Sequence, residues 1–144
     1  MLFRSFPSHD RKVIIVIPNH LPHIDFLLEW NELWDKEIII VQDIGKKPTI
    51  PPYLLNVTIY DHNDIKKDLG SNDWIIPTAS SACRSYGYYK AWQRGADVIM
   101  TLDNDCFPDS SGSFYKGHLN NLNLQVTLDW VSSIKELDYT RGLS

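Results

Sequence analysis

The chain has 144 residues, which is the usual length of one domain and too short for two ordinary ones. Its 14 Lys and Arg residues against 18 Asp and Glu residues give a net charge of −4, which excludes a broad basic surface for nucleic acid. With 43% hydrophobic and 22% charged residues, the composition is that of a globular protein with enough apolar side chains for a core.

The sequence also argues against a membrane protein and against a disulfide-rich secreted one. The longest apolar runs, such as 13–17 and 38–41, are far shorter than the ~20 residues of a membrane-spanning helix. The N-terminus has no apolar segment typical of a signal peptide. Two cysteines, at positions 83 and 106, make neither a disulfide framework nor a zinc site by themselves. We therefore expect a cytoplasmic protein that forms a single domain over residues 1–144.

The first third of the chain predicts a strand, a helix and a second strand. Residues 12–18 form a β-branched run that ends in Pro, which is typical of a strand buried on both faces. Residues 25–34 have apolar side chains three and four positions apart, which predicts an amphipathic helix. Residues 37–42 are a second β-branched run. Together the three elements predict a βαβ unit with parallel strands.

The alternation continues toward the C-terminus. A Pro-rich loop at 46–53 precedes a short predicted strand at 57–60, which a polar stretch over 61–70 follows. Residues 80–94 predict a helix because serines stand at its start and a glycine follows it. Residues 97–102 predict another buried strand.

The last expected elements are a helix over 114–124 and a strand over 126–131. Strands that alternate with helices predict an α/β fold, here a three-layer αβα sandwich with a mostly parallel sheet. The side chains of Trp30, Trp34 and Trp92 fit helix faces, and we expect them in the core rather than in a sugar-stacking platform.

Polar residues follow three of the predicted strands, at 18–20, 42–43 and 103–105. Ligands of α/β sheets bind beyond the carboxyl ends of the strands. Asp103 and Asp105 can project to the same side there, because side chains two apart on an extended chain share a face. Such a pair can hold a Mg²⁺ or Mn²⁺ ion that also binds a diphosphate, or it can be a solvated turn that ends the strand. Composition alone predicts about one Asp-x-Asp pair, so only the position after a buried strand favours a metal site.

Other polar residues also have both a functional and a structural interpretation. Asp43 can accept a hydrogen bond from a uracil N–H or a ribose hydroxyl, or it can be a cap or turn residue. Neither common glycine-rich phosphate loop is present, so a diphosphate needs a cation or a basic side chain such as Arg84. From the sequence alone, an ordinary exposed helix residue is the favoured interpretation of Arg84. His20 lacks metal-ligand spacing, which is typical of a structural or surface histidine.

In six segments the chain resembles the reversibly glycosylated polypeptides, also called UDP-arabinopyranose mutases, which form glycosyltransferase family 75. The segments follow one another in the family's order with similar spacing, from about residue 13 to residue 142. They are Val16–Pro18, Ile39–Asp43, Tyr60–Ile65, Ser81–Gly87, Thr101–Phe107 and Arg141–Gly142. Ser-Ala-Cys-Arg followed by Asp-x-Asp-Cys-Phe is far more specific than an acidic pair alone.

The resemblance implies a GT-A-like (Rossmann-like) nucleotide-sugar-binding domain for a UDP-sugar, with a divalent cation, Mn²⁺ or Mg²⁺, at the acidic pair. It assigns Asp103 and Asp105 to the metal, gives Asp105 a catalytic role as well, and matches Arg141 to the family's reversibly glycosylated arginine. The family usually has Asp at the position of Asn104. The positions that the resemblance assigns to the bound nucleotide-sugar are Pro18, Asp43, Asn63, Asp64, Arg84, Asp103 and Asn104.

The activity implied by the resemblance is reversible autoglycosylation with pyranose–furanose interconversion of a UDP-sugar. In that reaction the anomeric C–O bond breaks and the cation stabilises the leaving UDP. Two alternatives remain: another GT-A glycosyltransferase that passes a sugar to a glycan or protein acceptor, or a catalytically incomplete binding or assembly module. Family members are longer, so we expect this chain to correspond to their N-terminal nucleotide-binding part. The expected partners are a UDP-sugar and a second copy in a homo-oligomer, with no nucleic acid and no membrane span.

Overall fold

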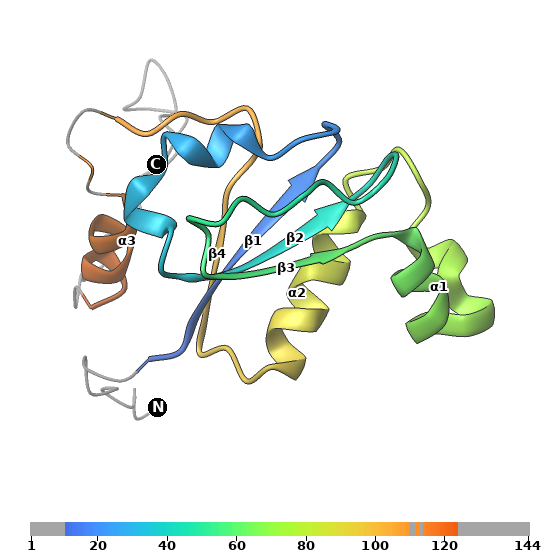
Figure 1. Ribbon diagram of the computed structural model, residues 1–144. Helices are drawn as coiled ribbons and strands as arrows, with labels where there is room; N and C mark the ends of the chain where they lie inside the picture. The colour runs from blue at the N-terminus through green and yellow to red at the C-terminus, as the bar shows by residue number, and fades with distance from the viewer. Residues whose placement is uncertain (1–10, 110–111, 113, 124–144) are drawn as a thin grey trace, which may run out of the picture.

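The computed structural model describes residues 11–109, 112 and 114–123. Within these residues four strands form one sheet in the order β3-β2-β1-β4, and every neighbouring pair is parallel (Figure 1). The strands are β1 Val13–Asn19, β2 Glu37–Gln42, β3 Asn56–Tyr60 and β4 Val98–Thr101. The prediction of an α/β fold with a parallel sheet is confirmed, and its strand order is that of a Rossmann-like half. The strand expected over 126–131 lies outside the described residues.

One face of the sheet packs against α1 (His62–Leu69) and α2 (Cys83–Gln93). Helix α2 turns its small residues Cys83, Gly87 and Ala91, spaced by four, toward the sheet, and all three are buried. A Cβ atom on Gly87 would overlap Val16 Cγ1, so the helix lies as close to β1 as a glycine allows. This close approach brings the N-terminal end of α2 next to the strand ends.

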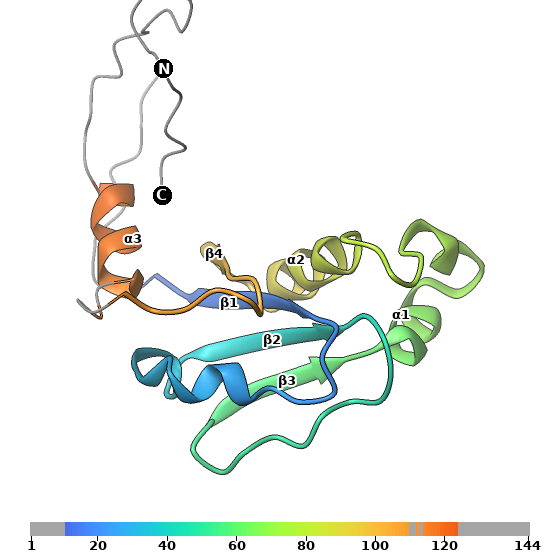
Figure 2. The ribbon, with the colours of Figure 1, turned by 90° about the horizontal axis from the view of Figure 1, so that it is seen from above.

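The opposite face is covered by two 3₁₀ helices, η1 (Asp25–Leu28) and η2 (Asn31–Leu33), and by α3 (Phe114–Asn123) (Figure 2). The rings of Trp30 and Phe114 meet edge to face, with their centroids 5.1 Å apart. Helical elements on both faces give the predicted three layers.

The prediction of one amphipathic α-helix over residues 25–34 is wrong. The buried side chains of this segment, Leu27, Trp30 and Leu33, recur every three residues, which is the period of a 3₁₀ helix. The Trp34 indole Nε1 donates a hydrogen bond of 2.9 Å to the Leu27 carbonyl oxygen. Tertiary packing therefore decides the local geometry, and the spacing of apolar residues in the sequence did not show which helix type would form.

Helix α1 replaces the polar stretch that was expected after the third strand, and η3 (Gly70–Ile75) follows it. Asp61 caps α1 by accepting hydrogen bonds from the N–H groups of Asn63 and Asp64, at 2.9 and 3.2 Å. In return Asp64 Oδ2 accepts one from the Asp61 N–H, at 2.9 Å. This reciprocal capping box starts the helix, and its signature in the sequence is the Asp-x-x-Asp spacing.

Helix α2 begins at Cys83, three residues after the predicted start at residue 80, because residues 81–82 form a turn. The expectation that Trp92 is a core residue is wrong, since 69% of its surface is exposed. Trp92 does not belong to the small-residue face that packs on the sheet. Trp30 is buried and Trp34 is partly buried, as expected. Among the described residues, no helix has both the length and the apolar composition needed to span a membrane.

Candidate functional site

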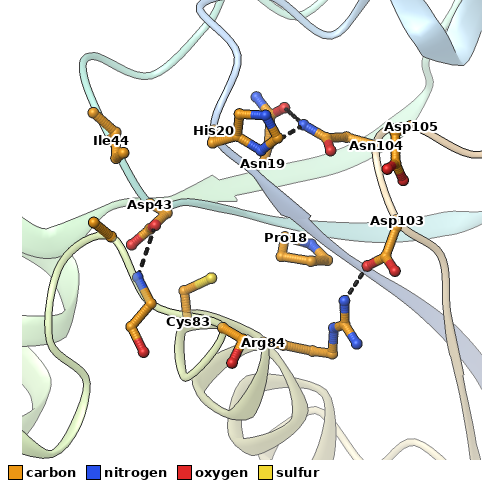
Figure 3. A pocket seen from close by; sticks show the side chains of 13 residues that line it. Pro18, Asn19, His20, Asp43, Ile44, Cys83, Arg84, Asp103, Asn104 and Asp105 are labelled. Carbon is orange, nitrogen blue, oxygen red and sulfur yellow. Dashed lines mark hydrogen bonds and ion pairs between the residues drawn. The ribbon is translucent and has the colours of Figure 1, made fainter.

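A hollow of about 430 Å³ opens at the carboxyl edge of the sheet, beyond the ends of β1, β2 and β4 (Figure 3). The loop before α2 and the first turn of that helix close its other side. Six of the residues singled out in the sequence line it together, although they come from four separate segments. They are Pro18, Asp43, Arg84, Asp103, Asn104 and Asp105.

Asp103 and Asp105 follow β4 and both line this hollow. The Asp103 carboxylate forms an ion pair with Arg84, whose guanidinium Nη2 contacts Asp103 Oδ1. Arg84 stands in the first turn of α2, so this pair joins the helix to the segment after β4. Asp105 is exposed at the rim. A carboxylate has two oxygens, so Asp103 can pair with Arg84 through one and offer the other to a cation.

Asp43 is a buried carboxylate that fixes the loop before α2 to the end of β2. Its Oδ2 accepts a hydrogen bond of 3.1 Å from the Ser80 N–H, and its Oδ1 accepts one of 3.3 Å from His62 Nε2. The residue before Ser80, Ala79, has a φ of 55°, in the left-handed region that L side chains rarely adopt. Asp43 therefore anchors this loop, which differs from the cap or turn role considered from the sequence, and each of its oxygens retains a lone pair for a ligand donor.

Cys83 lies beside Asp43 and is buried. Burial raises the pKa of the Cys83 thiol, and the negative charge of Asp43 raises it further. A thiol that stays protonated is a poor nucleophile. Cys83 is therefore a packing residue at the N-terminal end of α2.

Behind the hollow, buried amides connect the ends of three strands. Asn19 Nδ2 donates a hydrogen bond of 2.7 Å to Gln42 Oε1, and Asn104 Nδ2 donates one of 2.9 Å to Asn19 Oδ1. Asn104 was assigned to the bound nucleotide-sugar, but its side chain turns toward Asn19 and His20 and only 7% of its surface is exposed. The amide therefore positions the segment that carries the two aspartates.

Asn63 and Asp64 are consecutive residues in the first turn of α1, but their side chains have different surroundings. Asn63 lines a second hollow of about 350 Å³, which shares Asp43, Ile44 and Ala79 with the first. In the part of the chain that the structure describes, Asp64 lines neither hollow, because it caps α1 and pairs with Lys47 at 2.6 Å. Burial alone would raise the pKa of Asp64, but its hydrogen bonds lower it below the ordinary value. Arg141, matched to the glycosylated arginine, lies outside the described residues.

The donor set of the hollow suits an open cation site. Asp103 and Asp105 offer hard oxygen donors, which Mg²⁺ and Mn²⁺ prefer. Among the described residues, no group of three or more His, Cys, Asp or Glu side chains could hold a metal ion. Most coordination positions would thus be left to ligand oxygens and water. The charged groups of the described lining are three carboxylates and one guanidinium, so a diphosphate there needs additional positive charge.

Three further residues that line the hollow were not assigned to a site from the sequence: His20, which was interpreted as a structural or surface histidine, and Ala79 and Ser80. His20 stands directly after β1, in one of the three polar strand ends, and that position was the available signal. A search for the spacing of metal ligands could not identify His20, because its ring contacts the side-chain amide of Asn104. The turn at Ala79 and Ser80 has no signal in the sequence, since alanine rarely adopts a positive φ.

A sequence model of a protein family matches residues 8–134, and the family is described as reversibly glycosylated polypeptide. The chain belongs to the reversibly glycosylated polypeptide family. The matched range includes every residue that lines the hollow. A search of curated proteins finds no match. The expected family resemblance is thereby confirmed, and five of the six segments lie within the matched range, whereas Arg141–Gly142 lies beyond it.

Proposed function

We propose that this member of the reversibly glycosylated polypeptide family binds a UDP-sugar in the hollow at the carboxyl edge of the sheet. One observation carries the proposal: three separate segments bring Asp43, Arg84, Asp103 and Asp105 to one hollow. The place agrees with the general rule for ligands of parallel α/β sheets. Family membership favours a UDP-sugar over other nucleotides.

The two hollows suggest how the ligand lies. The diphosphate is placed beside Arg84, the cationic side chain of the described lining. The uridine extends toward Asp43 and the second hollow, where Asn63 contributes a further amide. A hydrogen bond that involves a charged group contributes about 1.5–3 kcal/mol, so Arg84 and Asp43 supply enough energy to orient the nucleotide.

Asp103 and Asp105 are proposed to hold a divalent cation, Mn²⁺ or Mg²⁺, which would add the positive charge that a departing diphosphate requires. Arg84 adds a second positive charge from the protein. In the reaction the anomeric C–O bond breaks and its electron pair stays with UDP. The anomeric carbon then bonds to a guanidine nitrogen of Arg141, which loses a proton. While the pentose is bound to Arg141, its C1–O5 ring bond opens as O5 takes a proton, and the C4 hydroxyl closes on C1 as it releases one. Reverse transfer to UDP then returns the sugar as the furanose, and the guanidine nitrogen regains its proton.

Calorimetry with UDP tests the binding step. We expect a dissociation constant in the micromolar to millimolar range in the presence of Mn²⁺ or Mg²⁺, and much weaker binding after chelation. Folded protein that binds no UDP with either metal would contradict the proposal.

The chemical step needs a separate experiment, because a UDP-sugar transferase with another acceptor would share the same donor site. After incubation with UDP-arabinopyranose, we expect UDP-arabinofuranose in the chromatogram and a labile pentose on Arg141 in the mass spectrum. The Arg141→Lys variant is the matched control and should accumulate neither. Transfer only to an added glycan or protein acceptor would favour another GT-A transferase. UDP binding without turnover would favour a binding or assembly module, whose self-association light scattering would detect.

A further inference from the structure

The ring of His20 lines the hollow and contacts the buried amide network. Its Nδ1 lies 3.3 Å from Asn104 Nδ2. In a neutral histidine one ring nitrogen donates a hydrogen bond and the other accepts one. The neighbours of Asn104 therefore decide which nitrogen of His20 is the hydrogen-bond donor toward the ligand. The positions of the nitrogen and the oxygen in each side-chain amide of the network follow, one after another, from hydrogen bonds to backbone groups.

The orientation of Gln42 is set first. Its Nε2 lies 3.0 Å from the Leu21 carbonyl oxygen and 2.5 Å from the Ile44 carbonyl oxygen. A carbonyl oxygen only accepts hydrogen bonds, so the group between these two oxygens must be the amide nitrogen. Gln42 therefore presents Oε1, an acceptor, to Asn19.

The orientation of Asn19 follows. Its Nδ2 donates to Gln42 Oε1 and also to the Leu21 and His23 carbonyl oxygens, at 2.9 and 3.3 Å. Its Oδ1 accepts a hydrogen bond of 3.3 Å from the Leu21 N–H. Asn19 Oδ1 is thus an acceptor, and the atom of Asn104 that lies 2.9 Å from it must be the amide nitrogen. The same nitrogen contacts His20, so His20 Nδ1 must accept.

We infer that the amide network holds His20 as the neutral Nε2–H tautomer, which makes it a hydrogen-bond donor to a phosphate oxygen of the nucleotide in the hollow. Figure 3 shows the Asn104 amide turned toward both Asn19 and His20. With Nδ1 engaged, Nε2–H is the remaining polar group of this exposed ring. The choice of ligand rests on the proposed function, whereas the tautomer rests on the contacts of the protein alone.

The tautomer can be measured without any ligand. Long-range ¹⁵N–¹H spectra of the labelled full chain at pH 8, where an ordinary imidazole is neutral, should show His20 protonated on Nε2. The His20→Gln spectrum assigns its signals. His118 is an internal control with the opposite state, because its Nδ1 lies 2.8 Å from the Phe114 carbonyl oxygen and must donate. An Nδ1–H form or an imidazolium at His20 would overturn the inference.

The Asn104→Asp variant tests the cause. A carboxylate has only acceptors, so His20 Nδ1 should become the donor and the tautomer should reverse. Asn121→Asp on α3 adds the same charge outside the network and should leave His20 unchanged. An unchanged His20 tautomer in folded Asn104→Asp protein would contradict the assigned role of the amide. If that variant does not fold, the unaltered protein's spectrum and the binding comparison below still decide.

Two isosteres of His20 test the contact with the ligand. A glutamine amide nitrogen can replace Nε2–H, whereas an asparagine amide nitrogen takes the place of Nδ1. We expect UDP to bind His20→Gln within about threefold of the unaltered protein and His20→Asn about tenfold more weakly. Equal affinities in all three proteins would refute the donor role. If the unaltered protein binds no UDP, both the proposed function and the contact between His20 and the ligand are wrong. In that case the ¹⁵N–¹H spectra alone decide the tautomer of His20.

Discussion

Helix α2 carries an arginine near each end, and the two meet different surroundings. Arg94, at the C-terminal cap, donates to Glu37 Oε1, Thr58 Oγ1 and Tyr60 Oη at distances of 2.8 to 3.2 Å. Arg84, in the first turn, pairs with Asp103 at the edge of the hollow. The Arg94 guanidinium therefore donates to acceptors on two strands, whereas the Arg84 guanidinium forms an ion pair that borders the hollow.

This difference indicates that the charge of Arg94 stabilises the fold, whereas the charge of Arg84 can bind a ligand. Burial alone would lower the pKa of Arg94, but the hydrogen bonds to Tyr60 and Glu37 raise it above the ordinary value. A hollow of about 340 Å³ also borders Arg94, so a hollow and a cation together do not define a binding site. What distinguishes Arg84 is its place at the carboxyl edge of the sheet, beside two carboxylates that have few protein partners.

The largest expected effect is at the rim of the hollow. Asp105→Ala should weaken metal-dependent UDP binding about hundredfold, because loss of even an outer-shell partner of a metal ligand costs about 10–100-fold in metal affinity and Asp105 is proposed as a ligand itself. The melting temperature should change by less than about 2 °C, since Asp105 is exposed. Calorimetry and thermal unfolding measure the two effects, with the exposed Asp25→Ala as the matched control. Unchanged UDP affinity in Asp105→Ala would remove the case for this carboxylate.

Replacing each arginine by alanine in a separate variant tests the comparison of Arg84 with Arg94 directly. Arg84→Ala should weaken UDP binding about thirtyfold through loss of a charge-assisted contact, with little change in stability. Arg94→Ala should instead lower the free energy of unfolding by about 2 kcal/mol, because three acceptors lose their donor. Its UDP affinity should remain within about twofold. Chemical denaturation and calorimetry on both variants give the result, and similar profiles for the two would break the distinction.

The strands were predictable because each contains β-branched residues. Their burial was predicted less well: β1 and β2 are buried as expected, but only Met100 is buried in β4, which was also predicted to be a buried strand. It was also predictable that Asp43 and Asp103 would lie at the same edge of the sheet, because each follows a strand and parallel strands end at one edge. The 3₁₀ helices were missed because tertiary packing decides them, whereas α1 was missed although the Asp-x-x-Asp spacing of its capping box is visible in the sequence. The amide network was also out of reach: Asn19 and Gln42 are ordinary polar residues until the register of β1 and β2 places them side by side.

The close contact between α2 and the sheet gives a further prediction, because it holds both arginines in position. Gly87→Ala adds a methyl group that overlaps Val16 Cγ1 and lies 3.1 Å from Val41 Cγ2. Overpacking costs about 1–3 kcal/mol, and the better helix propensity of alanine recovers up to about 1 kcal/mol. We expect a net loss of about 1–2 kcal/mol in chemical denaturation. Gly117→Ala on α3, with open space at its Cβ, should stabilise by about 0.5–1 kcal/mol; equal effects of the two variants would contradict the packing.

The smallest effect is expected where Asp68 of α1 contacts Tyr86 and Lys90 of α2. Asp68 on α1 accepts hydrogen bonds from Lys90 Nζ at 2.9 Å and from Tyr86 Oη at 2.7 Å, and these lower its pKa below the ordinary value. A lowered pKa in the folded state stabilises the protein above the unfolded pKa of about 3.9, and this contribution is lost as the pH falls through the folded value. Asp68→Asn should therefore lower the melting temperature by about 1–3 °C at pH 7, because partly exposed ion pairs contribute little.

The same comparison at lower pH shows whether the Asp68 charge is the cause. Below the folded pKa of Asp68, both proteins carry a neutral side chain at this position, so their melting temperatures should converge. UDP binding at pH 7 should be unchanged, because Asp68 does not line the hollow in the described part of the chain. A difference in melting temperature that stays constant from pH 7 to about pH 3 would instead assign the effect to packing of the amide rather than to the charge.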